Sequence, residues 1–160
     1  MINRRSMTLS TLALLASPAV AATPRPAAPT ETVWKPADTP PGGVAWSLLE
    51  STQEVPVPGK DGVSRANYPP GVRALHGKKV KVAGYMMPLE NGPNQTHFVL
   101  LAYPPDCPYH TNPSAGQFIE VTTKTGIPFD YKVKVVEGVL QLTGQGDGGI
   151  FYKMVDGMPA

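Results

Sequence analysis

Alternating hydrophobic and polar residues begin near position 80 and recur through the second half of the chain. Val80, Val82 and Gly84 fall on one side of an extended segment, and the intervening lysines fall on the other side together with Ala83. This period of two predicts a half-buried β-strand. Four later segments also combine β-branched or aromatic residues with turn-forming flanks, namely 96–101, 118–122, 132–142 and 150–155. The pattern therefore predicts five strands.

The fourth of these strands is long and contains a glycine in mid-course. Val133 and Val135 are predicted to face one way and Lys132 and Lys134 the other, while Gly138 is predicted to mark a bulge or a bend at a barrel corner. Five strands with no helical pattern between most of them predict a mainly β fold, a small barrel of the five-stranded oligonucleotide/oligosaccharide-binding (OB) type. Its expected core residues are Val80, Val82, Phe98 or Leu100, Val133, Val135 and Leu140.

The region before the strands carries a short helical spacing followed by many turn residues. Trp46 and Leu49 lie three positions apart and predict a short opening helix over 44–49, with an apolar side that packs on a larger body. Four prolines and three glycines follow between residues 51 and 71. They predict a loop laid over the domain surface.

The first 21 residues have the layout of an export signal. Arg4 and Arg5 precede an apolar run over 7–16, and a small-residue cleavage site ends at Ala21. The apolar run is shorter than the ~20 residues of a spanning helix, and no cysteine follows the cleavage site to accept a lipid. We therefore expect a protein that is cleaved and released into the periplasm, exported by either the twin-arginine or the general secretory route.

Composition divides the chain into three parts. After the signal (1–21), residues 22–41 include six prolines and form a predicted disordered tether rich in Pro and Ala. Residues 42–160 are predicted to form a single β-barrel domain. The chain has 14 Lys and Arg and 12 Asp and Glu, so loss of Arg4 and Arg5 with the signal leaves a neutral protein. A neutral protein lacks the basic surface that nucleic acids require, so we expect no nucleic-acid partner.

A single cysteine and a nearby histidine form the candidate metal site. A thiolate at Cys107 and an imidazole at His110, two residues further along, are suited to chelate one soft divalent ion. On the predicted strand, Thr96 and Phe98 lie on the side opposite His97. His97 is therefore expected to point toward Cys107 as a third ligand. Zinc and copper are the candidate metals. The alternative is that Cys107 is an ordinary loop cysteine and His97 a half-exposed strand histidine, with no metal bound.

Two adjacent methionines, Met86 and Met87, suggest a second soft-metal site, because thioethers bind Cu(I). Adjacent strand residues face opposite sides, however, so one sulfur is expected in the core and only one remains for a site. The sequence carries no nucleophile-elbow motif, no paired carboxylates on neighbouring strand positions and no glycine-rich phosphate turn between strand and helix. We therefore expect a protein that is not an enzyme.

A longer string of residues resembles a known bacterial family. The string Gly77–Leu89, the apolar segment 98–100 and a cysteine in a Pro-rich loop together resemble the exported family known as domain of unknown function 3299. The resemblance covers about 46–121. It implies a periplasmic protein encoded beside a MacB-like ABC transporter and zinc-responsive periplasmic proteins. Its most specific part contains three candidate binding residues, Tyr85, Met86 and Met87.

These inferences combine into one expected function and one alternative. The expected function is that of a periplasmic binding or accessory protein that works with an envelope transport system of the ABC type and is related to metal ions. The alternative is a protein–protein adaptor that binds no metal and uses its Pro-rich loops as the contact surface.

Overall fold

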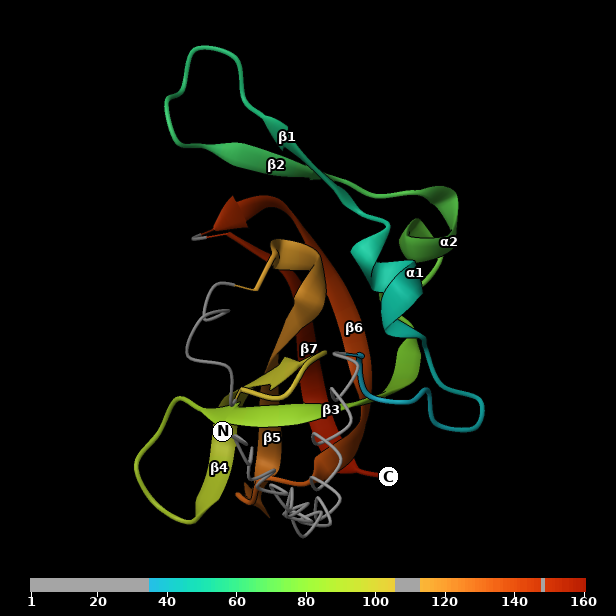
Figure 1. Cartoon of the computed structure of the whole chain (residues 1–160), viewed down its shortest axis with the longest axis vertical. Coiled ribbons are helices and arrows are strands. Elements are labelled where there is room, and N and C mark those ends of the chain that lie inside the picture. The colour runs from blue at the N-terminus through green and yellow to red at the C-terminus, as the bar shows by residue number, and fades with distance from the viewer. Residues whose placement is uncertain (1–34, 106–112, 148) are drawn as a thin grey trace, which may run out of the picture. The chain divides into compact units, whose positions relative to one another are not determined.

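The fold is seen in a computed structural model, which describes residues 35–105, 113–147 and 149–160 (Figure 1). The predicted signal and most of the predicted tether lie outside the described residues. No helix in the described ranges has the length and apolar composition needed to cross a membrane. The described elements are α1 (Trp46–Glu50), β1 (Gln53–Pro56), β2 (Ser64–Asn67), α2 (Pro70–Arg73), β3 (Lys79–Pro88), β4 (Asn94–Leu101), the 3-10 helix η1 (Ala115–Gln117), β5 (Phe118–Pro128), β6 (Val133–Asp147) and β7 (Ile150–Pro159).

Five strands close into a barrel. Their order is β3-β4-β5-β7-β6, and β6 returns to pair with β3. All neighbours are antiparallel except β5 and β7, which run parallel. This order is that of an OB-type barrel, in which the third and fifth strands lie side by side. The predicted mainly β, five-stranded OB-like fold is therefore confirmed.

The barrel interior holds the alternating apolar residues of β3 and β4. Val80, Val82 and Met86 of β3 are buried, and so are both Phe98 and Leu100 of β4. They pack with apolar residues of β5, β6 and β7 in one continuous core. The alternation read from the sequence is thus the inside-outside alternation of the closed sheet.

The side-chain orientation predicted for the start of β6 is wrong. Val133 is 43% exposed, and the buried residues of this strand are Val136 and Leu140. The reason is the register with β3, in which Val136 lies opposite Val82. Directly paired residues share a face of the sheet, so the inward direction of Val82 sets that of Val136 and turns Val133 outward. Val135, expected in the core, is only partly buried.

The irregularity predicted at Gly138 is a bulge in the neighbouring strand β7, where Asp156 and Gly157 lie opposite Gly138. The β6–β7 register shifts between Glu137 and Val139. A Cβ at Gly138 would lie 2.7 Å from the Met154 side chain and 2.9 Å from the Val155 carbonyl oxygen. β6 therefore needs a residue without a side chain where it lies against the bulge of β7.

The predicted loop over 51–71 is a hairpin followed by a short helix. β1 and β2 pair from Gln53↔Asn67 to Pro56↔Ser64, and β2 meets the long end of β6 at Arg65↔Gln145. Two tight turns form the tip, because Lys60 N–H donates to Val57 O and Val63 N–H donates to Lys60 O. Of the Pro and Gly residues that predicted a loop, Pro58, Gly59 and Gly62 lie in the two turns, and Pro69, Pro70 and Gly71 begin α2. Each strand of the hairpin has only four residues. Figure 1 shows this hairpin beyond the ends of the β6 and β7 strands.

The opening helix α1 is present, two residues shorter at its start than predicted. Trp46 and Leu49 are buried, and the Trp46 indole N–H donates to Ala83 O over 2.6 Å. Tyr152 of β7 donates its hydroxyl to Leu49 O over 2.8 Å and lies 2.5 Å from the Thr52 hydroxyl. Burial raises the pKa of Tyr152 to about 12, so the hydroxyl stays a hydrogen-bond donor. These bonds attach the helix to the barrel.

A pair of substitutions tests the inward and outward faces. Val82→Asp should unfold the domain, because an unpaired buried carboxylate costs several kcal/mol against a total stability of ~5–15 kcal/mol. Val133→Asp should leave the fold intact, because the side chain already reaches solvent. Circular dichroism melts of both variants measure this. A folded Val82→Asp variant, or loss of the fold in Val133→Asp, would contradict the β3–β6 register.

Candidate functional site

The candidate site lies on the outer face of the barrel over β3, β4, β5 and β7. Met87, Val99, Glu120 and Lys153 form a row across these four strands, since each is the direct register partner of the next. His97 lies beside this row on β4. We call the five residues the β4–β5 face. β4 and β5 are the second and third barrel strands, whose outer surface is the ligand-binding face of OB-type barrels.

Three polar side chains on the β4–β5 face form a linked group. The imidazole Nε2 of His97 lies 2.8 Å from Oε1 of Glu120, and Nζ of Lys153 lies 3.1 Å from Oε2 of the same carboxylate. The Glu120 side chain is 17% exposed, whereas its two partners reach solvent more freely. A central carboxylate is thus held between two groups that can each carry positive charge.

A bulge in β5 interrupts its ladder with β4 next to His97. Gln95 pairs with Ile127 and His97 pairs with Thr122, so residues 123–126 of β5 lie opposite Thr96 alone. Gln95 is fully buried, accepts a hydrogen bond from Glu90 N–H over 3.2 Å and donates to Gly92 O over 2.8 Å. The buried amide therefore fastens the β3–β4 connection to β4 beside the register shift.

The carboxylate of Glu90 holds the β4 backbone at the same place from the solvent side. It accepts the backbone N–H of Thr96 over 2.8 Å and that of His97 over 3.1 Å. These bonds, with the Thr96 N–H the strongest, lower the pKa of Glu90 below its usual value. The ionised carboxylate therefore accepts hydrogen bonds from two consecutive backbone N–H groups of β4 where the ladder with β5 is interrupted.

Opposing effects act on the pKa of Glu120. Burial by itself raises this pKa, because it disfavours the charged form. The contacts with His97 and Lys153 lower it by a larger total amount, so the pKa of Glu120 lies below its usual value. The carboxylate is therefore ionised at neutral pH and keeps its two partners in place.

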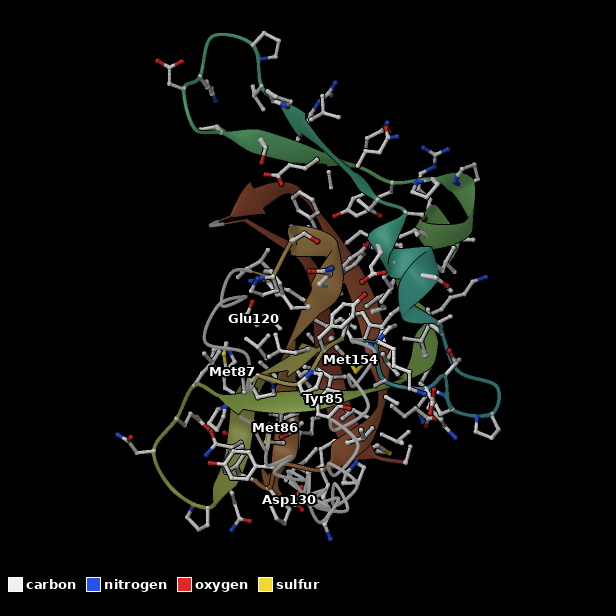
Figure 2. The ribbon with its side chains drawn as sticks, viewed as in Figure 1. Tyr85, Met86, Met87, Glu120, Asp130 and Met154 are labelled. Carbon is white, nitrogen blue, oxygen red and sulfur yellow. The ribbon has the colours of Figure 1, made fainter. Side chains whose placement is uncertain are left out.

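The adjacent methionines face opposite sides, as their position on one strand predicts. Met86 is buried in the core, and Met87 is exposed beside Val99. Figure 2 shows Met87 and Glu120 near one another at the edge of the barrel and Met154 inside it. Tyr85 is half-buried and lies between Leu101 of β4 and Val133 of β6. The exposed part of the β4–β5 face thus joins an apolar end to a charged end.

The structure places only some of the predicted site residues. His97 and Met87 lie on the β4–β5 face, Tyr85 lies on the next row of the outer surface, and Met86 lies in the core. Cys107 and His110 lie outside the described residues, so their distance from His97 is not defined. Among the described residues, no group of three or more His, Cys, Asp or Glu side chains is arranged to hold a metal ion.

Sequence reasoning missed the role of Glu120 and Lys153. Each is a charged residue at an alternate position of a predicted strand, which by itself indicates only a solvated side. Their contact depends on the parallel pairing of β5 with β7, which joins residues 33 positions apart. Nothing local in the sequence reports such a pairing.

Comparison with known proteins identifies the family. The family described as "Protein of unknown function (DUF3299)" matches residues 52–151. The chain belongs to this family. A crystal structure of a DUF3299 family protein from Pseudomonas aeruginosa PAO1 is similar at a TM-score of 0.53 and 22% sequence identity, covering 74% of this chain and 95% of that one. At this identity the likeness concerns the fold. No curated protein matches the chain.

Membership of the DUF3299 family confirms the predicted resemblance. The matched residues run from β1 into the start of β7, so they include most of the barrel and four members of the β4–β5 face. Lys153 lies just beyond the match.

Replacing the central carboxylate tests the polar group. Glu120→Gln should lower the free energy of unfolding by about 1–2 kcal/mol near neutral pH, because it removes hydrogen bonds to groups that carry charge. The Glu120 contribution is present above the carboxyl pKa of the unfolded chain, about 4.3, and is lost as pH falls through the lower pKa of the folded state. The difference between wild type and variant should therefore shrink as the pH is lowered below about 4.

Urea unfolding at a series of pH values measures this difference. Asp38→Asn is the matched control, since this exposed carboxylate forms an ion pair with the exposed Lys35. It should change the stability by less than about 0.5 kcal/mol at any pH. A Glu120→Gln variant as stable as wild type at neutral pH would show that the polar group contributes nothing to the fold.

Proposed function

We propose that the protein is an exported accessory protein of an envelope ABC-type transport system and that it binds a partner protein through the β4–β5 face. The observation that carries the proposal is the row Met87–Val99–Glu120–Lys153, in which an exposed apolar end and a fixed charged end share one outer surface. The signal-like first 21 residues support export to the periplasm.

The chemistry of the face favours binding over catalysis. Both oxygens of Glu120 face a positively charged or protonatable partner, so this group orients its neighbours. Lys153 and His97 retain exposed surface and are held in fixed positions, which suits recognition of a complementary charged segment. Met87 adds a flexible apolar contact, a residue type that is enriched in protein interfaces.

The partner that fits this face is a protein segment with apolar and acidic side chains. Its apolar residues would cover Met87 and Val99, and an acidic residue would reach Lys153 at the other end of the row. An acidic residue is favoured because the charged group carries two potentially positive side chains for one carboxylate.

Site-specific crosslinking tests the proposal. A photoreactive p-benzoylphenylalanine in place of Thr122, the exposed register partner of His97, should crosslink in living cells to a component of an envelope ABC-type transporter. The same group in place of Lys60, at the tip of the β1–β2 hairpin, is the control position. Mass spectrometry identifies the crosslinked protein.

Charge reversal at Lys153 tests in the same crosslinking experiment whether this residue binds the partner. Lys153→Glu should reduce the crosslink yield from position 122 at least about fivefold, because like charges oppose the acidic segment. Lys78→Glu reverses an exposed charge elsewhere and should leave the yield unchanged. Crosslinks to the transporter from position 60 alone would favour an adaptor that uses its Pro-rich hairpin, and absence from both positions would refute the proposed partner.

A second candidate function is the binding of zinc or copper by Cys107, His110 and His97. The observation that favours it is the bond between His97 Nε2 and Glu120, because a carboxylate on one imidazole nitrogen orients the other as a metal ligand. The described residues form no hydrogen bond with the Nδ1 atom of this imidazole. His97 would thus offer Nδ1 to an ion held by the thiolate.

Titration calorimetry with zinc chloride tests the metal candidate on the reduced, signal-free protein. Cys107→Ser and His97→Gln should each abolish stoichiometric binding, and Glu120→Gln should weaken it at least about tenfold through loss of the oriented imidazole. His76→Gln is the control, since the His76 Nδ1 accepts the Leu142 N–H and lies on another element. Equal binding by wild type and Cys107→Ser would exclude the site.

A further inference from the structure

Four methionines form two pairs with opposite exposure. In β3, Met86 is 2% exposed and its neighbour Met87 is 38% exposed. In β7, Met154 is fully buried and Met158 is 49% exposed. Each pair contains one sulfur inside the barrel and one that reaches solvent, within the same strand.

Exposure decides which thioether reacts with a peroxide. The sulfur lone pair attacks a peroxide oxygen, a sulfur–oxygen bond forms, and the oxygen–oxygen bond breaks. Methionine is oxidised to the sulfoxide and hydrogen peroxide is reduced to water. Buried Met86 and Met154 react only after the barrel opens, whereas Met87 and Met158 react in the folded state.

Only one of the two exposed methionines lies on the proposed binding face. Met87 is the register partner of Val99, next to Glu120 in the row. Met158 lies opposite Glu137 of β6, five residues from Lys153 and therefore roughly 16 Å along the strand. Oxidation of Met87 introduces a polar, chiral sulfoxide at the apolar end of the face, whereas oxidation of Met158 leaves the face unchanged.

We propose that Met87 is a reversible oxidation site that controls the β4–β5 face. Peroxide converts Met87 to the sulfoxide while Met86 stays reduced, and the sulfoxide weakens contact with an apolar partner segment. A methionine sulfoxide reductase reverses the change. The control of binding rests on the proposed function, but the oxidation itself does not.

Peptide mapping after hydrogen peroxide treatment tests the selectivity. Trypsin cleaves after Lys81, Lys124 and Lys153, so one fragment carries Met86 with Met87 and another carries Met154 with Met158. Each fragment contains its own buried control. In the folded protein, Met87 should be oxidised at least about tenfold faster than Met86, and the two rates should converge in urea. Equal rates in the folded protein would overturn the proposal.

Crosslinking from position 122 tests the consequence. Peroxide should lower the yield at least about threefold, Met87→Gln should reproduce this loss without peroxide, and Met87→Leu should protect the yield from peroxide. Met158→Gln is the matched control and should have no effect. Treatment with a methionine sulfoxide reductase should restore the yield of the oxidised wild-type protein.

The peptide map and the crosslink yield distinguish failure of selective oxidation from failure of the control of binding. An unchanged yield in Met87→Gln overturns the control of binding even where oxidation is selective. Absence of any crosslink from position 122 refutes the proposed function and the control that rests on it, while the selectivity of oxidation still stands or falls on the peptide map alone.

Discussion

The pairing of β3 with β6 closes the barrel, and the other features depend on it. Seven consecutive residues of β3, from Lys79 to Tyr85, each have a partner in β6. Because Val82 lies opposite Val136, the inward face of one strand sets that of the other. A shift of one residue would expose the β6 apolar residues and disrupt the core.

Closure also creates the outer face. In the closed order, β5 has β4 on one side and β7 on the other, so a side chain of β5 meets residues from both. Glu120 is the residue in this position, and it joins His97 of β4 to Lys153 of β7. A charged group across three strands therefore follows from topology, and the fold supplies a site that no single strand contains.

The irregular positions of the sheet direct side chains. Opposite the bulge in β5, the backbone of β4 is held by Gln95 from inside and by Glu90 from outside, next to the contact of His97 with Glu120. A second bulge, in β7, lies against Gly138 of β6. Both are specific hydrogen-bonding or packing arrangements, so they define geometry that a regular strand would not provide. The crystal structure of another DUF3299 family protein shares the fold.

The amino-acid sequence by itself determined the strands, the mainly β class and much of the core. Alternation at Val80 and Val82 reports burial directly, because a period of two is the geometry of a sheet with one buried face. The spacing of Trp46 and Leu49 likewise indicated a helix with one buried side, and Gly138 indicated an irregular position of the sheet. These are local signals, carried by a few neighbouring residues.

Tertiary structure alone decided which strands are neighbours and which face of β6 is inside. Val133 and Val135 alternate as well as a core pair would, and only the partner strand shows that Val133 is exposed and Val135 is only partly buried. The hairpin at 53–67 has strands too short for a pattern, so it forms through pairing across its turns. The contacts among His97, Glu120 and Lys153 join strands that are distant in sequence. Pairing between strands that are distant in sequence leaves no pattern among neighbouring residues. The site could therefore be found only in the folded chain.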